Sequence, residues 1–267
     1  MTNIKFAVSM QRLLPFVGYH HILMLVQTVG VILTSIVLAG CSSYSSMTNV
    51  YILGLSYTNS TTENLSPIGK NLSDTFSRYK GGSQLEVRTG YFGMCVRQRG
   101  VVWLCSSDAA GLAIQIGQES DPLDLIGASA KFRDDVIFSG LLFMAIVLAF
   151  ASVLLLATFP GWHEETDERT GSVVDVKPFP SRPISQIALS CSFVASILLL
   201  ISGLWQHVGS VGAAAMADIA YHGSVHTDIG AQAVAMTWAS FTLIMISAIA
   251  LLMMILSILA LDRLTDD

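Results

Sequence analysis

Four long apolar runs divide the chain. They cover residues 21–41, 137–159, 185–206 and 235–261, and none of them contains Asp, Glu, Lys or Arg. An α-helix needs about 20 apolar residues to cross the roughly 30 Å of a bilayer's hydrocarbon core. Each run is long enough, so the pattern predicts four transmembrane helices and a multi-pass membrane protein.

The first run also admits another reading. Its end, Leu38-Ala39-Gly40-Cys41, resembles the cleavage box of bacterial lipoproteins. A secretory apolar core is about 7–15 residues long, however, whereas this run is longer and three further runs follow it. We therefore interpret residues 21–41 as a span.

The basic residues of the short polar segments indicate the orientation. The segment between the third and fourth runs has no Lys or Arg, whereas the other short segments carry Lys5, Arg12, Arg169, Lys177, Arg182 and Arg263. Cytoplasmic loops are enriched in Lys and Arg, and long loops translocate largely regardless of charge. Both termini are therefore predicted to be cytoplasmic.

These boundaries give the expected organisation, an all-α membrane bundle with a small extracellular β domain. An outward extension of the third helix beyond residue 206 is included in this expectation. In chain order we expect a cytoplasmic N-terminus at 1–20, spans at 21–41, 137–159, 185–206 and 235–261, extracellular loops at 42–136 and 207–234, a cytoplasmic loop at 160–184, and a cytoplasmic C-terminus at 262–267.

Composition agrees with this class and excludes others. Charged residues make up 12% of the chain, about half the share in soluble domains, and mean hydropathy is +0.61. The net charge of −5 is spread along the chain, so no nucleic-acid partner is expected. No phosphate loop, dinucleotide fingerprint or HExxH motif is present. We expect neither an enzyme nor a bound cofactor.

The first half of the long loop is polar. Residues 57–83 are rich in Asn, Ser, Thr and Gly and are interpreted as surface loop. N-x-S/T glycosylation sequons occur at Asn59, Asn64 and Asn71, and Pro67 follows the second of them closely. Three sequons on the predicted outer side favour a eukaryotic glycoprotein.

The second half of that loop predicts a disulfide-linked hairpin. Residues 85–88 alternate apolar and charged side chains, as a half-buried strand does. Two further strands with a turn near Gly100 would place Cys95 opposite Cys105. A disulfide is expected there because the compartment is oxidising. Cys41 and Cys191 fall in predicted spans and are expected to be small buried side chains.

A family resemblance rests on this hairpin. The sequence Gly90-Tyr91-Phe92-Gly93-Met94-Cys95, followed by Cys105 in the first outer loop of a four-span protein, resembles the claudin superfamily. It is most similar to the fungal mating-factor-induced branch, whose members are described as calcium regulators and membrane-fusion proteins. Animal claudins have a motif closer to G-L-W-x-x-C with a tryptophan upstream. Phe92 replaces that aromatic here, and no tryptophan precedes Trp103.

The resemblance implies a function that the residues alone do not show. It implies a plasma-membrane protein that supports calcium influx and cell fusion during mating and polarised growth, as a regulator or component of a low-affinity calcium entry system. Calcium-channel subunits are the implied partners, beside the lipid bilayer and further copies of the chain. The alternative is a structural or adhesive scaffold that assembles laterally through its extracellular antiparallel sheet without transporting ions.

Two other groups of polar residues are weaker candidates. Residues 106–136 contain six acidic side chains but no EF-hand pattern, which favours solvated surface over a calcium site. Asp218, His222 and His226 are spaced by four, so a continuous helix would align them as zinc ligands or as a pH-sensitive group. Gly223 makes that helix doubtful, and ordinary loop polarity is the preferred interpretation.

Overall fold

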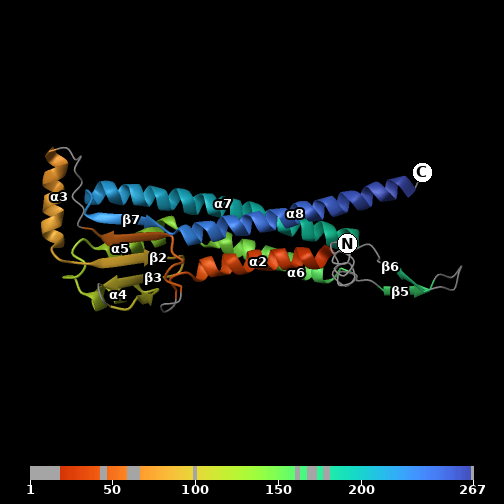
Figure 1. Cartoon of the computed structure of the whole chain (residues 1–267), viewed down its shortest axis with the longest axis horizontal. Coiled ribbons are helices and arrows are strands. Elements are labelled where there is room, and N and C mark those ends of the chain that lie inside the picture. Colours follow the sequence, from red (N-terminus) through yellow and green to blue (C-terminus); the bar gives the residue numbers. More distant parts are fainter. Residues whose placement is uncertain are drawn as a thin grey trace, which may run out of the picture. The chain divides into compact units, whose positions relative to one another are not determined.

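The structure is a computed structural model that describes residues 19–42, 47–58, 67–98, 101–159, 163–166, 173–176 and 181–265. The chain divides into two compact units, drawn in Figure 1. The helical unit comprises Met1–Ile32, Met144–Leu198 and Ser240–Asp267, and the sheet unit comprises Leu33–Phe143 and Leu199–Ala239.

Four helices are long and apolar enough to cross a membrane. They are α2 (Tyr19–Ala39), α6 (Gly140–Ala157), α7 (Arg182–Tyr221) and α8 (Ala231–Thr265). The predicted four-helix class is confirmed. Helix α7 has 40 residues and continues past Gln206 to Tyr221, about 22 Å further at 1.5 Å per residue.

Helix α2 shows how the helical unit is adapted to lipid. Most of its exposed side chains are large and apolar, among them Ile22, Leu25 and Val29, whereas Gln27 is fully buried. This arrangement inverts the pattern of a water-soluble helix, because lipid rather than water is the solvent. The apolar core of the unit includes Leu23, Leu156, Phe159, Ala188 and Leu251.

Polar side chains join the helices inside this unit. Gln27 Nε2 of α2 donates to Ser192 Oγ of α7 over 2.7 Å, and Ser192 Oγ lies 2.7 Å from Ser152 Oγ of α6. Small residues allow close approach as well, since a Cβ on Gly30 would lie 3.1 Å from Ile244 of α8. Gln186, by contrast, is exposed. Interhelical hydrogen bonds of this kind give membrane bundles their register.

The sheet unit contains five antiparallel strands in the order β4-β3-β2-β1-β7. The strands are β1 (Leu53–Tyr57), β2 (Leu85–Thr89), β3 (Met94–Gln98), β4 (Leu104–Ser106) and β7 (Val225–Ile229). Alternate residues face the core, as the buried Leu85 and Val87 of β2 show. The predicted small antiparallel sheet is confirmed, and β7 comes from the segment between α7 and α8.

Short helices complete the sheet unit. They are α3 (Pro67–Lys80), α4 (Ala109–Ile116) and α5 (Leu125–Lys131), followed by a π-helical turn, η1 (Phe132–Val136). The expectation that residues 57–83 form only surface loop is wrong for α3. Leu72, Phe76 and Tyr79 recur at helical spacing along it, and Phe76 stacks on His222 with ring centroids 6.1 Å apart.

Two further segments contain regular structure. Asp134 and Asp135 lie in η1, and the first turn of α6 contains no acidic residue. In the predicted cytoplasmic loop at 160–184, β5 (His163–Thr166) and β6 (Val173–Val176) pair as an antiparallel hairpin. The β-branched residues of β6 favour a strand, a signal that the surrounding charges and prolines obscure.

Candidate functional site

The candidate site is the segment Gly90 to Cys105, which we call the signature hairpin. Its strands β3 and β4 place Cys95 directly opposite Cys105, and the two sulfurs are bonded. The disulfide closes a loop with a sequence separation of 10 residues. Chain-entropy estimates for such a short loop give somewhat less than about 3 kcal/mol of stabilisation. The bond therefore fixes a small sheet edge.

The two glycines of the hairpin lie against the chain that leaves α2. A Cβ on Gly90 would lie 2.2 Å from the carbonyl oxygen of Gly40, and one on Gly93 would lie 2.6 Å from that of Cys41. Gly40 in turn approaches Val50, whose carbonyl oxygen would be 2.3 Å from a Cβ. These distances are far below van der Waals contact, so only glycine fits at these positions.

Cys41 sits at the centre of this contact. It is fully buried with φ +54°, and its thiol lies 3.9 Å from the carbonyl oxygen of Thr48. Its own carbonyl oxygen is 3.7 Å from the Cys95 sulfur. Burial raises the pKa of the Cys41 thiol to about 12, although Arg88 opposes the shift. The thiol is therefore protonated and unreactive at neutral pH.

The aromatic residues of the hairpin point to different environments. Tyr91 is buried, and its hydroxyl donates to Gln206 Oε1 of α7 over 3.2 Å. Burial raises the pKa of Tyr91 above its ordinary value. Phe92, in contrast, is about half exposed. Tyr91 thus connects the hairpin to the part of α7 that belongs to the same unit.

An arginine on β2 organises the polar face of the sheet. The Arg88 guanidinium lies 4.7 Å from the ring centroid of Tyr51 and 4.5 Å from that of Trp103. Its Nε donates to Glu86 over 2.9 Å, and Arg97 donates to the same carboxylate over 2.6 Å. Stacking of this kind is worth about 0.5–2 kcal/mol. The cluster ties the hairpin to the chain before β1.

The start of β1 is fixed to β7 as well. The Tyr51 hydroxyl donates to the Asp228 carboxylate, and a Cβ on Gly230 would lie 1.6 Å from the Tyr51 carbonyl oxygen. Burial, followed by the hydrogen bond to Asp228 and its charge, raises the pKa of Tyr51 to about 12. Tyr51 remains protonated over the physiological range.

Some predicted site residues are not brought together. Helix α7 ends at Tyr221, so Asp218 lies on the helix, His222 follows it with φ +47°, and His226 belongs to β7. The continuous helix that would align these three side chains does not form. In the chain that the structure describes, no group of three or more His, Cys, Asp or Glu is arranged to hold a metal.

The acidic segment includes a structural carboxylate. Asp121 is buried rather than solvated: it accepts hydrogen bonds from the Tyr57 hydroxyl over 2.7 Å and from the backbone N–H groups of Leu125 and Ile126 over 2.9 Å each. This satisfies free donors at the start of α5. Burial is the main cause that raises the pKa of Tyr57, and the hydrogen bond to Asp121 is the next.

The three sequons divide between described and undescribed residues. Asn59 and Asn64 lie outside the described residues. Asn71 is exposed on α3, and its backbone carbonyl oxygen accepts a hydrogen bond from the Thr75 hydroxyl. The Asn71 side chain is therefore accessible for modification.

Sequence reasoning missed the partners of the hairpin. Gly40 contacts it from the chain that leaves α2, Gln206 from α7 and Arg88 from β2. In the sequence, Gly40 is only a small residue near the end of the first predicted span, and Gln206 is only a polar residue at the end of the third. Neither signal indicates which distant backbone will approach.

One comparison with known proteins gives a family for this chain. Among curated proteins, no match is found. The family model described as "Ca2+ regulator and membrane fusion protein Fig1" matches residues 72–257. The match includes the whole signature hairpin and the helices α6 and α7, and it covers more than two thirds of the chain. The protein therefore belongs to the Fig1 family of Ca2+ regulator and membrane fusion proteins.

Proposed function

We propose that the protein is a non-enzymatic plasma-membrane protein that supports calcium influx and cell fusion during fungal mating and polarised growth. The observation that carries the proposal is the family match across residues 72–257, which includes the disulfide-linked hairpin, the helices α6 and α7, and most of α8. The family description supplies calcium regulation and membrane fusion; the mating context rests on the resemblance of the hairpin.

In this proposal both termini are cytoplasmic and the sheet unit is extracellular. The Cys95–Cys105 disulfide supports an oxidising location for the sheet unit. The absence of Lys and Arg between α7 and α8, where β7 lies, supports the same side. The disulfide of the signature hairpin then stabilises the extracellular sheet unit, and calcium-channel subunits are the expected partners of the protein.

Calcium uptake tests the proposal directly. Uptake is measured in cells that lack the gene, with and without a mating stimulus. We expect stimulus-dependent uptake to be lost, and to be restored by the wild-type gene together with efficient cell fusion. Unchanged uptake and fusion in the deletion strain would remove the basis of the proposal.

A second candidate function is lateral assembly as a structural or adhesive scaffold. Strand β4 is an edge strand of only three residues, and the adjoining Val101 and Val102 are 59% and 75% exposed. Exposed apolar side chains beside a sheet edge favour association. Cysteine crosslinking between copies at residue 102 tests this function. Crosslinked dimers of the expressed protein, together with normal calcium uptake in cells that lack the gene, would favour the scaffold.

A further inference from the structure

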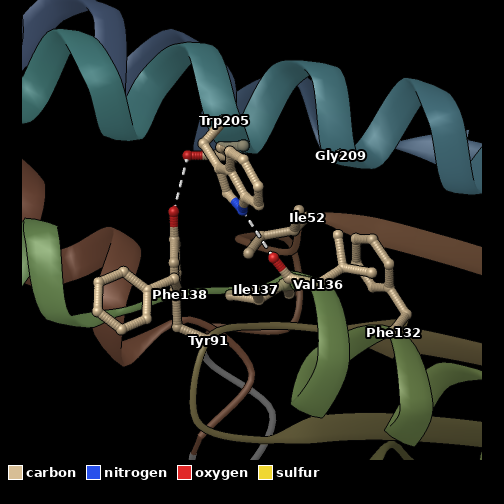
Figure 2. Close-up of a pocket in the computed structure, with 9 residues that line it drawn as sticks. Ile52, Tyr91, Phe132, Val136, Ile137, Phe138, Trp205 and Gly209 are labelled. Carbon is tan, nitrogen blue, oxygen red and sulfur yellow. Dashed lines mark hydrogen bonds between the residues drawn. The ribbon is translucent and has the colours of Figure 1, made fainter.

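A cleft opens in the sheet unit where α7 passes the segment that enters α6 (Figure 2). The empty space between its walls is about 210 Å³ when the open solvent at its mouth is included, and only a small part of that space is enclosed. Among the described residues, the walls are apolar except for Tyr91 and Gln206, and none of the residues that line them carries a carboxylate, amine or guanidinium. The cleft is too small to enclose a whole lipid, and it can accept one small polar group from a larger molecule.

Gln206 lines this cleft and has a buried hydrogen-bonding atom that is unused. Its side chain is only 5% exposed, and its Oε1 accepts from the hydroxyls of Tyr91 over 3.2 Å and Thr237 over 3.0 Å. Within the part of the chain that the structure describes, its Nε2 has no hydrogen-bond partner. Rotating the amide by half a turn would only exchange which of the two atoms is unpaired. Buried amide atoms are normally satisfied.

A hydroxyl group is the best complement to that atom. It accepts a hydrogen bond from an amide N–H and can also donate one to an amide oxygen. A phosphate or ammonium head group would bring a charge into a lining that offers no opposite charge. The chemistry of the cleft therefore favours a neutral amphiphile with a single hydroxyl.

Two exposed aromatic residues line the cleft. Trp205 and Phe138 are 57% and 60% exposed, and Figure 2 shows Trp205 next to the segment 136–138, to which Phe138 belongs. The Trp205 indole N–H donates to the Val136 carbonyl oxygen over 2.7 Å, which fixes the ring. Tryptophan near the end of an apolar run marks the membrane–water interface, the depth at which a lipid hydroxyl lies.

We propose that this cleft binds a sterol-type membrane lipid, with its hydroxyl on the Gln206 amide and its rigid fused rings against Trp205 and Phe138. The inference requires only that the four helices lie in a bilayer, and it does not depend on the proposed role in calcium influx.

Photocrosslinking of the full-length protein tests the proposal. The purified protein is placed in phosphatidylcholine nanodiscs with a ring-diazirine sterol, and labelled residues are mapped by mass spectrometry. We expect labelling at residues 136–138 and at Trp205 that excess unlabelled sterol displaces. Gln206→Leu should lower this displaceable labelling at least about fivefold, the effect of one lost hydrogen bond to a buried group.

Two further variants make the result specific. Gly209→Leu should also abolish the labelling, because a Cβ at Gly209 already lies 3.1 Å from Val136 Cγ1 and a longer side chain fills the cleft. Gln186→Leu removes an exposed glutamine from the same helix and should have no effect. Retention of the Cys95–Cys105 disulfide, measured by mass spectrometry without reduction, confirms that each variant is folded.

Three outcomes would overturn the proposal. The first is labelling of the wild-type protein that unlabelled sterol does not displace. The second is displaceable labelling in folded Gln206→Leu and Gly209→Leu that equals the labelling of the wild-type protein. The third is equal displacement by a diacylglycerol, a neutral lipid with one hydroxyl and no fused rings, which would make the cleft a general lipid contact. The first and third need only the wild-type protein, and none involves calcium uptake.

Discussion

Gly90, Gly93 and Gly40 bring separate stretches of backbone closer together than any side chain allows. Glycine is tolerated there at the entropic cost of a more flexible unfolded chain. The spacing of the two hairpin glycines therefore reflects the path of the chain after α2, whereas Phe92 between them is half exposed.

Gly90→Ala is predicted to destabilise the protein by about 1–3 kcal/mol, because a methyl group is forced against the Gly40 carbonyl oxygen. Thermal unfolding in detergent measures the loss. Gly82→Ala is the matched control, since nothing lies within 4 Å of a Cβ at Gly82, and a change within about 0.5 kcal/mol is expected. Equal stability of the two variants would contradict the close contact at Gly90.

Cys41 is predicted to resist alkylation in the folded protein. Its pKa of about 12 instead of 9 lowers its thiolate fraction about a thousandfold at pH 8.5. In a Cys191→Ser background, iodoacetamide should modify Cys41 only after denaturation. Because the folded state retains this proton, its contribution to stability is present below about pH 9 and is lost as the pH rises towards 12. Rapid labelling of the folded protein would contradict this account.

At the scale of elements, the sheet and the helices are stabilised differently. The hairpin depends on a covalent bond between β3 and its short edge strand β4. The helices depend on small residues and buried hydroxyl or amide groups, because lipid gives no hydrophobic drive for one helix to pack on another.

Cys95→Ser and Cys105→Ser are each predicted to reduce surface delivery or calcium uptake. Removing a native disulfide typically costs about 2–5 kcal/mol, and the remaining thiol is left able to form wrong disulfides. Surface biotinylation and calcium uptake are measured together, with Cys191→Ser as the control because Cys191 forms no disulfide. Normal surface delivery and normal calcium uptake in both variants would show that the Cys95–Cys105 disulfide is dispensable.

Gly30→Leu is predicted to separate α2 from α8, since a Cβ at Gly30 already lies 3.1 Å from Ile244. A loss of about 1–3 kcal/mol is expected from overpacking. Gly212→Leu, at a position of α7 with nothing within 4 Å of a Cβ, is the matched control. A lower thermal midpoint in detergent for Gly30→Leu alone is the expected result, and equal midpoints would exclude close packing at Gly30.

At the scale of the whole molecule, the prediction concerns orientation. Epitope tags at both termini should bind antibody only after permeabilisation, whereas a tag inserted after Gly82, which is exposed between α3 and β2, should bind in intact cells. Glycosidase treatment should reduce the apparent mass, by less in Asn71→Gln. Antibody binding to the terminal tags in intact cells would contradict the proposed orientation.

The sequence by itself determined the four helices, because 20-residue apolar runs without charge have no other stable state in a bilayer. It also determined the pairing of Cys95 with Cys105, because alternating residues and a glycine turn fix a local register. The strand β1 and the helices α3 to α5 were missed, since their short, mixed patterns are stabilised by packing against distant residues such as His222.

Only the tertiary structure decided what the signature glycines touch. The approach of Gly90 and Gly93 to Gly40 and Cys41 joins segments about 50 residues apart, and no local pattern encodes such a contact. The same holds for Tyr91 and Gln206, which are 115 positions apart. Hydrophobic periodicity specifies which face of an element is buried, whereas the partner of a buried polar or glycine residue depends on how the whole chain folds.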